Sequence, residues 1–255
     1  MDRPFRLRRP PVTRVRLGLF FEPLEDIGVT DASEFVANFR PSFPDVVERL
    51  PLLSWQEDPQ PGSVLVRANS TPAFPLVSMT SATGDREISF QADRFVLAWT
   101  FDEGAGPYPG YDELSAQLRG MFDEFSAVLV AGGVPPLRVH QAQCFYLNTV
   151  RELPGTALAV YLLTGEERVS ARDLLSGRTY AGARVRLPLE AALPAQLQAG
   201  VDSESDDAAI LWLRVTVDNP DDEATDPLDL AHDLLIERFV SLTPNWLRED
   251  WNKVS

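Results

Sequence analysis

Cys144 is the only cysteine of this 255-residue chain, and with His140 it could form the pair that cysteine-based nucleophilic catalysis requires. They lie four residues apart in a segment with the pattern of a strand, so they share one face. At about 3.3 Å per residue the two would lie ~13 Å apart, which is too far for the hydrogen bond that activates a cysteine. We therefore expect Cys144 to be a small buried apolar residue.

His232 is the other histidine, and Asp233 and Glu237 lie near it in a segment with helical periodicity. One imidazole with carboxylates can bind a divalent cation, but the chain has no His-Glu-x-x-His motif. The acidic segment 218–223 has oxygen ligands yet lacks the order and the glycine of a calcium loop. We favour a histidine that is hydrogen-bonded at the edge of the core, and we predict no metal and no cofactor.

The glycine-rich segment 104–110 has the strongest similarity to a phosphate-binding loop. Its third glycine is one place too late for a dinucleotide fingerprint, and two prolines remove backbone donors, so a strand-to-helix connection is favoured. Lys253 is the only lysine and lies outside any lysine-dependent motif. Catalysis by a pair of carboxylates stays open, because 38 acidic residues form many pairs whose distances the sequence does not give.

The formal net charge of −15 opposes binding to nucleic acid and to anionic membranes, and favours a basic or neutral partner. One cysteine cannot form an internal disulfide, and no apolar run is long enough to cross a bilayer. These features predict a cytoplasmic protein without a membrane anchor.

The elements that must position these residues are strands, which have an apolar period of two residues, and helices, which have an apolar period of three to four. In the first half we predict strands at 15–21, 64–68, 76–80, 87–91 and 94–101, and helices at 31–40, from Pro44 to Leu50, and at 111–131. In the second half we predict strands at 138–150, 157–163, 183–189 and 209–218, helices at 171–176 and after Pro227, and acidic loops at 202–207 and 218–226.

The double glycine at 132–133, followed by two prolines, ends the long helix and marks the expected boundary between halves. The sequence therefore predicts an α+β fold with a mostly antiparallel sheet, helices packed on one face, and two α+β halves at 1–132 and 133–255. No residue-level repeat relates the halves.

Several short motifs occur in an order that resembles a sporadically distributed family of uncharacterised bacterial proteins of similar length. They are Pro10-Pro11-Val12 before the strand 17–24, Phe43-Pro44, Trp99 followed by Tyr108-Pro109-Gly110-Tyr111, Tyr146-Leu147-Asn148, and the pattern from His232 through Phe239 to Leu242-Thr243-Pro244 and Trp251. Members commonly have arginine or another polar residue where this chain has Phe20 and Phe145, and arginine where it has Thr149. A ligand that needs those arginines would be lost here.

The resemblance implies a cytoplasmic protein of the bacterial accessory gene pool, with no activity that can be transferred. We predict a non-enzymatic protein-interaction or regulatory protein of such a locus, with a role in defence as one option, and a partner protein encoded nearby. The alternative is an enzyme or small-ligand-binding protein with a carboxylate and arginine pocket between sheet and helices. The candidate partner-binding residues are Arg14, Arg16, Tyr108, Tyr111, Tyr146, Asn148 and His232. For Arg14 and Arg16 the alternative is the solvated face of an edge strand.

Overall fold

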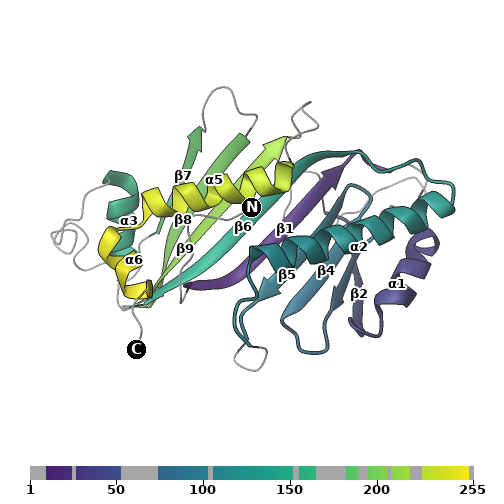
Figure 1. The fold of residues 1–255 in the computed structure, drawn as a ribbon, viewed down its shortest axis with the longest axis horizontal. Helices are drawn as coiled ribbons and strands as arrows, with labels where there is room; N and C mark the ends of the chain where they lie inside the picture. Colours follow the sequence, from purple (N-terminus) through teal and green to yellow (C-terminus); the bar gives the residue numbers. More distant parts are fainter. Residues whose placement is uncertain are drawn as a thin grey trace. The chain divides into compact units, whose positions relative to one another are not determined.

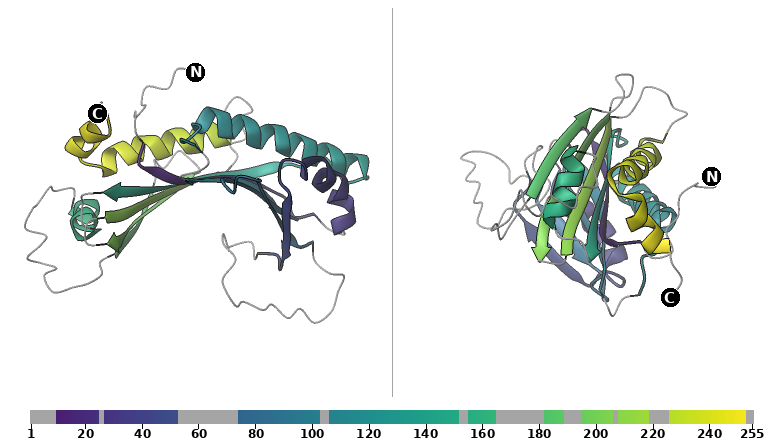
Figure 2. Two further views of the ribbon diagram at one scale, coloured as in Figure 1. Left: turned by 90° about the horizontal axis from the view of Figure 1, so that it is seen from below. Right: turned by 90° about the vertical axis from the view of Figure 1, so that its left-hand side faces the viewer.

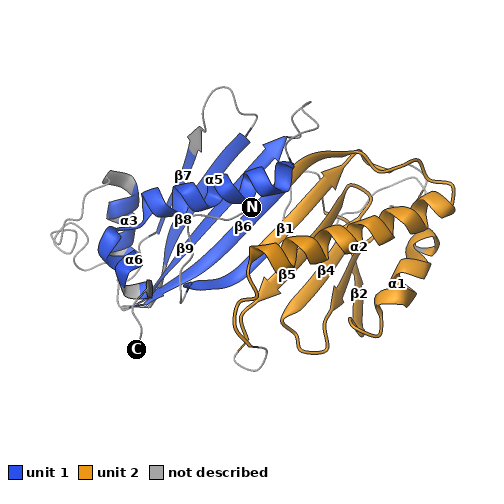
Figure 3. Cartoon of the chain, in the orientation of Figure 1, with its two compact units in different colours: residues 1–15, 143–255 blue, residues 16–142 orange. Residues whose placement is uncertain are grey.

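A computed structural model of the protein (Figure 1) describes residues 10–24, 27–52, 74–102, 106–151, 155–164, 182–188, 195–205, 208–218 and 226–252. Its strands form a nine-stranded antiparallel sheet in the order β2-β3-β4-β5-β1-β6-β9-β8-β7. The predicted α+β class with a mostly antiparallel sheet is confirmed. The chain divides into two compact units, unit 2 with residues 16–142 and unit 1 with residues 1–15 and 143–255 (Figure 3).

Unit 2 is built on a meander of four strands with a long helix after it. Its elements are β1 (Val12–Phe21, which begins in unit 1), the 3-10 turn η1 (Val29–Ala32), α1 (Ser33–Phe39), β2 (Asp45–Arg49), β3 (Leu76–Thr80), β4 (Arg86–Gln91), β5 (Arg94–Thr100) and α2 (Tyr111–Ala131). The chain reverses between β3 and β4 at Gly84, which has φ +75° and whose N–H donates to the carbonyl of Ser81. The predicted bounds of α2 agree with the structure.

The core of unit 2 is a cluster of aromatic rings between the meander and the helices. Phe35 of α1 meets the rings of Phe90, Phe95 and Phe125 edge-on, at centroid distances of 5.3, 5.7 and 5.4 Å. This geometry stabilises buried aromatic pairs beyond the area that they bury. In Figure 2, α1 and α2 accordingly lie on the same side of the unit 2 strands.

The helix predicted from Pro44 to Leu50 is wrong, because this segment is strand β2. It pairs antiparallel with β3, with Val46 opposite Met79 and Val47 opposite Ser78. Two adjacent β-branched residues favour an extended backbone, and pairing with β3 outweighs the helix-starting tendency of Pro44.

Unit 1 also combines strands with helices on them. Its elements are β6 (Val139–Arg151, which begins in unit 2), α3 (Gly155–Thr164), β7 (Gly182–Pro188), β8 (Ala195–Ser205), β9 (Ala208–Asp218), α5 (Pro227–Leu242) and α6 (Asn245–Asn252). The strand predicted at 138–150, the one at 183–189 and the one at 209–218 are confirmed, as is the helix after Pro227. Helix α3 lies against β7 and β8, and α5 lies against β9.

The core face of unit 1 is apolar and closed to solvent. Leu197, Ala199 and Val201 of β8 and the paired residues of β9, Leu211, Leu213 and Val215, are fully buried. Asp226 caps α5 by accepting hydrogen bonds from the backbone N–H groups of residues 228 and 229. At the other end, the Arg248 guanidinium donates to the carbonyls of Val240 and Thr243, which satisfies two of the last acceptors of α5.

Two further predictions for unit 1 are wrong. The segment 157–163 is not a strand but part of α3, because its short apolar run of alanines and leucines suits either state and buries Leu158, Ala159 and Leu162 at helical spacing. Residues 202–205 are not an acidic loop but the end of β8. This strand was not predicted, because its polar composition is unusual for a strand. The predicted strand at 64–68, the helix at 171–176 and most of the loop at 218–226 lie outside the described residues.

The two units repeat one topology. Each consists of a strand, a helix, a meander and a second helix, and in each the last strand of the meander is a neighbour of the first strand. Thus β1 neighbours β5 in unit 2, and β6 neighbours β9 in unit 1, while β2 is an addition to unit 2. The order of the elements is therefore repeated in the two units, although the residues themselves show no repeat.

Candidate functional site

The face of the unit 1 strands opposite the core carries a regular set of polar and aromatic side chains. Arg184 of β7 lies opposite Gly200 of β8, which lies opposite Trp212 of β9. The Gln143 amide of β6 approaches the Thr216 hydroxyl at 3.4 Å, which places the odd-numbered residues of β6 on this same face. We call this the open face of unit 1, because its side chains are half-buried or exposed whereas those of the core face are buried.

A stack of two arginines and two aromatic rings lies on the open face. The Arg184 guanidinium lies over the Trp212 indole, with its central carbon 5.2 Å from the ring centroid. Arg214 lies 5.9 Å from the same ring and 5.4 Å from the Phe145 ring. The two rings stack at 6.4 Å with an interplanar angle of 30°. These four residues, Phe145, Arg184, Trp212 and Arg214, form what we call the arginine–tryptophan cluster.

Gly200 makes room for this cluster. A Cβ atom added to Gly200 would lie 2.4 Å from Trp212 Cε2, so the indole lies directly across the glycine. Any larger residue would push the indole away from the sheet. Glycine in a strand commonly marks such a close approach, and here it lets Trp212 reach toward Arg184 two strands away.

The open face is basic although the chain is strongly acidic. Among the side chains that the structure describes on β6 to β9, this face carries four arginines, Arg151, Arg184, Arg186 and Arg214, and two aspartates, Asp202 and Asp218. The whole chain has 38 acidic and 23 basic residues. Positive charge therefore predominates among these described side chains, in contrast to the chain as a whole.

This arrangement suits recognition more than catalysis. A guanidinium stacked on an aromatic ring keeps its N–H groups available at its edge, and stacking holds it in place before a ligand arrives. Tryptophan and arginine are also the residue types that contribute most to protein interfaces. The cluster can thus bind carboxylate groups and the apolar surface next to them.

Unit 2 has a comparable aromatic–arginine pair on the equivalent strands. Arg94 of β5 lies 5.4 Å from the Phe20 ring of β1. Here, however, Arg94 is buried, with 3% of its side chain exposed, and forms a two-point ion pair with Asp93 at 2.8 and 2.9 Å. Gln91 joins the pair by donating to Asp93 and to the carbonyl of Leu52. The charge of this arginine is neutralised inside the unit.

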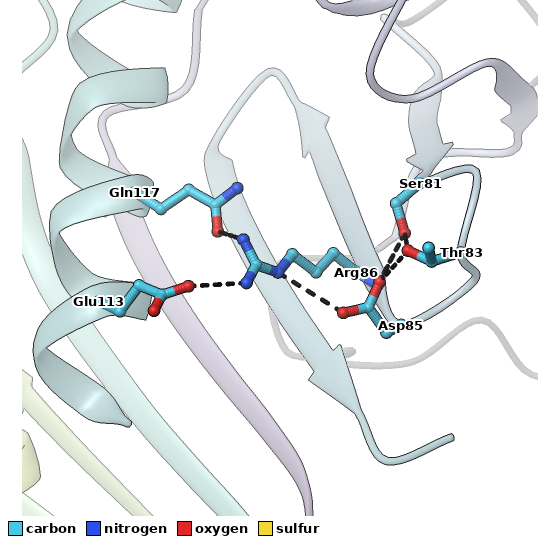
Figure 4. Close-up of polar contacts among 6 residues, drawn as sticks. All are labelled: Ser81, Thr83, Asp85, Arg86, Glu113 and Gln117. Atoms are coloured by element: carbon cyan, nitrogen blue, oxygen red, sulfur yellow. Dashed lines mark hydrogen bonds and ion pairs between the residues drawn. The ribbon is translucent and has the colours of Figure 1, made fainter. Parts of the chain in front are cut away.

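A second polar network of unit 2 ties the β3–β4 turn to α2 (Figure 4). The Arg86 guanidinium donates to Gln117 at 2.9 Å and to Glu113 at 2.7 Å, and its Nε lies 3.6 Å from Asp85. Asp85 in turn accepts from the hydroxyls of Ser81 and Thr83. Each residue of the network thus has a polar partner within it, so we interpret the network as a connection between sheet and helix.

Three of the predicted partner-binding residues come together in the interior of unit 1. Tyr146, Asn148 and His232 have 4%, 1% and 6% of their surface exposed. The Tyr146 and His232 rings are 5.9 Å apart, His232 Nδ1 lies 3.3 Å from Asp233, and Asn148 donates to the carbonyl of Leu211. Their part in binding a partner stays a prediction, and the contact between Tyr146 and His232 packs α5 on the sheet.

The other four predicted residues stand on β1, before α2 and at the start of α2. Arg14 and Arg16 are half-buried on β1, and Tyr111 is buried at the first position of α2. Tyr108 is half-buried and lies 5.1 Å from the Trp99 ring. None of the seven residues belongs to the arginine–tryptophan cluster.

Cys144 is buried on β6, and His140 is exposed at the start of the same strand. Within the described ranges, no group of three histidine, cysteine, aspartate or glutamate side chains is placed to hold a metal ion. No described helix is long and apolar enough to cross a membrane.

The cluster was not predicted because its residues come from three strands of unknown order, and because β8, the strand with Gly200 that lies between β7 and β9, was not predicted. Its sequence signal is the alternation in β9, where Trp212 and Arg214 occupy the face opposite to Leu211 and Leu213. A tryptophan and an arginine on the outer face of a strand would have marked this surface. The chain matches no protein-family model, no curated protein and no solved structure.

Proposed function

We propose that this chain is a non-enzymatic interaction protein that binds another protein through the open face of unit 1. The observation that supports the proposal is the arginine–tryptophan cluster. It combines an exposed arginine, a half-buried tryptophan seated on Gly200 and a local positive charge on an acidic chain.

A solvent-facing function accounts for this arrangement better than packing does. The core of unit 1 is complete on the opposite face, where the central residues of β8 and β9 are fully buried. Arg184 and Arg186 are exposed, so burial does not require them on this face. Stacked arginines and aromatic rings are a composition that interfaces favour.

Site-specific cross-linking in the host tests the proposal. A photo-reactive amino acid at Gln196, which is exposed on the open face, should cross-link one protein, and the same amino acid at Ala37 on α1 should not. Arg184→Glu should abolish the cross-link, and Arg40→Glu, which changes an exposed arginine of unit 2, should leave it intact.

A cross-link that survives Arg184→Glu would contradict the proposed surface. Turnover of a small molecule by the purified protein, with no protein cross-linked from Gln196, would contradict the proposed function.

A further inference from the structure

The geometry of the arginine–tryptophan cluster points to the kind of partner that it binds. We propose that the cluster recognises an acidic segment of a protein, with glutamate or aspartate side chains at alternate positions of an extended backbone. The inference rests on the proposed function and adds the chemistry of the partner.

The spacing of the two arginines fits alternate carboxylates. Arg184 and Arg214 both lie over one indole, and they stand on β7 and β9, two strands that are roughly 10 Å apart. Alternate residues of an extended segment are about 7 Å apart on the same side. The flexible side chains of arginine and glutamate cover the difference.

Stacking on the indole prepares exposed Arg184 for a carboxylate. Its guanidinium lies over the Trp212 ring, and a guanidinium stacked in this way presents the N–H groups of its edge beside the ring. A carboxylate can accept two parallel hydrogen bonds from such an edge, which is stronger and more directional than a contact with lysine. The indole that both arginines contact offers apolar contact to the segment's backbone and methylene groups.

Charge favours a protein segment over a nucleic acid. A nucleic acid presents a charge about every 1.7 Å along its axis, and the net charge of −15 would repel most of it. The open face, with four arginines and two aspartates, provides only a local positive area. A short acidic segment places its few carboxylates within that area.

Fluorescence anisotropy with a labelled peptide of alternating glutamate and serine tests the inference. The wild-type chain should bind this peptide and not the peptide of alternating glutamine and serine. Arg184→Gln and Arg214→Gln should each weaken binding by about tenfold, the loss of one charge-assisted contact. Gly200→Ala should weaken it at least as much, by displacing Trp212, and Arg40→Gln should not change it.

Because Arg184 is exposed, we expect the Arg184→Gln variant to fold. It therefore tests the inference even if the Gly200→Ala variant does not fold. Equal binding of the glutamine peptide, or full binding by Arg184→Gln, would overturn the inference. So would tighter binding of a labelled single-stranded DNA that Arg184→Gln abolishes. Self-association of the chain that Arg184→Gln removes would support it, with a second copy supplying the acidic segment.

The two proposals fail separately. If a partner cross-links from Gln196 in an Arg184-dependent manner but the acidic peptide does not bind, the partner chemistry is wrong and the proposed function stands. If the peptide binds the cluster but no protein is cross-linked in the host, the proposed function is wrong and the binding site stands.

Discussion

The same contact, an arginine over a phenylalanine, occurs in both units on equivalent strands and has two different environments. Phe20 and Arg94 join the first strand and the last meander strand of unit 2, as Phe145 and Arg214 do in unit 1, and both distances are 5.4 Å. In unit 2 the arginine is buried against Asp93. In unit 1 Arg214 is half-buried beside Trp212. The exposed Arg184 stands on β7, two strands away from β9.

This difference shows how one topology can use one contact for two purposes. A buried guanidinium needs a carboxylate, because an uncompensated charge in the interior is strongly destabilising. A guanidinium at the surface is solvated. Stacking on a ring orients it for a ligand without neutralising its charge. We therefore expect the unit 2 pair to affect stability and the unit 1 cluster to affect binding.

The largest expected effect is in unit 2. Asp93→Asn removes the carboxylate that forms the two-point ion pair with buried Arg94 and should lower the free energy of unfolding by about 3 kcal/mol. Arg184→Gln in unit 1 should change the same quantity by less than about 0.5 kcal/mol, since the residue is exposed. Urea unfolding followed by circular dichroism measures both. Equal losses in the two variants would remove the distinction between the units.

The glycines that lie under the aromatic rings give a smaller contrast. Gly200→Ala places a methyl group 2.4 Å from the Trp212 ring and should destabilise the protein by about 2 kcal/mol. Gly18→Ala in unit 2 meets Phe20 at 3.2 Å, which a slight ring movement relieves, so its loss should be less than half as large. Thermal unfolding of the two variants tests the order, and a larger loss for Gly18→Ala would contradict the close seating of Trp212.

The smallest expected effect on stability concerns the Arg86 network of unit 2. Arg86→Met removes the hydrogen bonds between β4 and α2 and should cost about 1 kcal/mol of stability. Glu113→Gln should cost less than about 0.5 kcal/mol, because 55% of the Glu113 side chain is exposed and its ion pair is weak. Chemical unfolding of both variants provides the comparison. If Glu113→Gln were the more harmful, the salt bridge rather than the network would join sheet and helix.

The parts of the fold with strong periodicity could be predicted from sequence. Strand β5 and helix α2 place their large apolar residues at spacings that allow one interpretation each. The apolar run of α3 permits both states, and β2 and β8 become strands through their neighbours. Local propensity is too weak to decide such segments, since tertiary pairing outweighs it.

The candidate site could be predicted least. Tyr146, Asn148 and His232 are polar in the sequence and buried in the structure, where Tyr146 packs against His232 of α5 and Asn148 donates to β9. Trp212 and Arg184 become neighbours only through the order β9-β8-β7. The role of Gly200, which makes room for the indole, depends on the position of β8 between them. A site made by neighbouring strands requires the strand order, which depends on contacts that are distant in sequence.

The indole N–H resonance of Trp212 tests the central claim most directly. The chain has five tryptophans, so the Trp212 signal can be assigned by Trp212→Phe in a two-dimensional spectrum of the nitrogen-15-labelled protein. On titration with the alternating glutamate peptide, this signal should shift in a saturable way, and the signal of Trp99, buried in unit 2, should not move. A shift of Trp99 with Trp212 unchanged would contradict the assignment of recognition to the open face of unit 1.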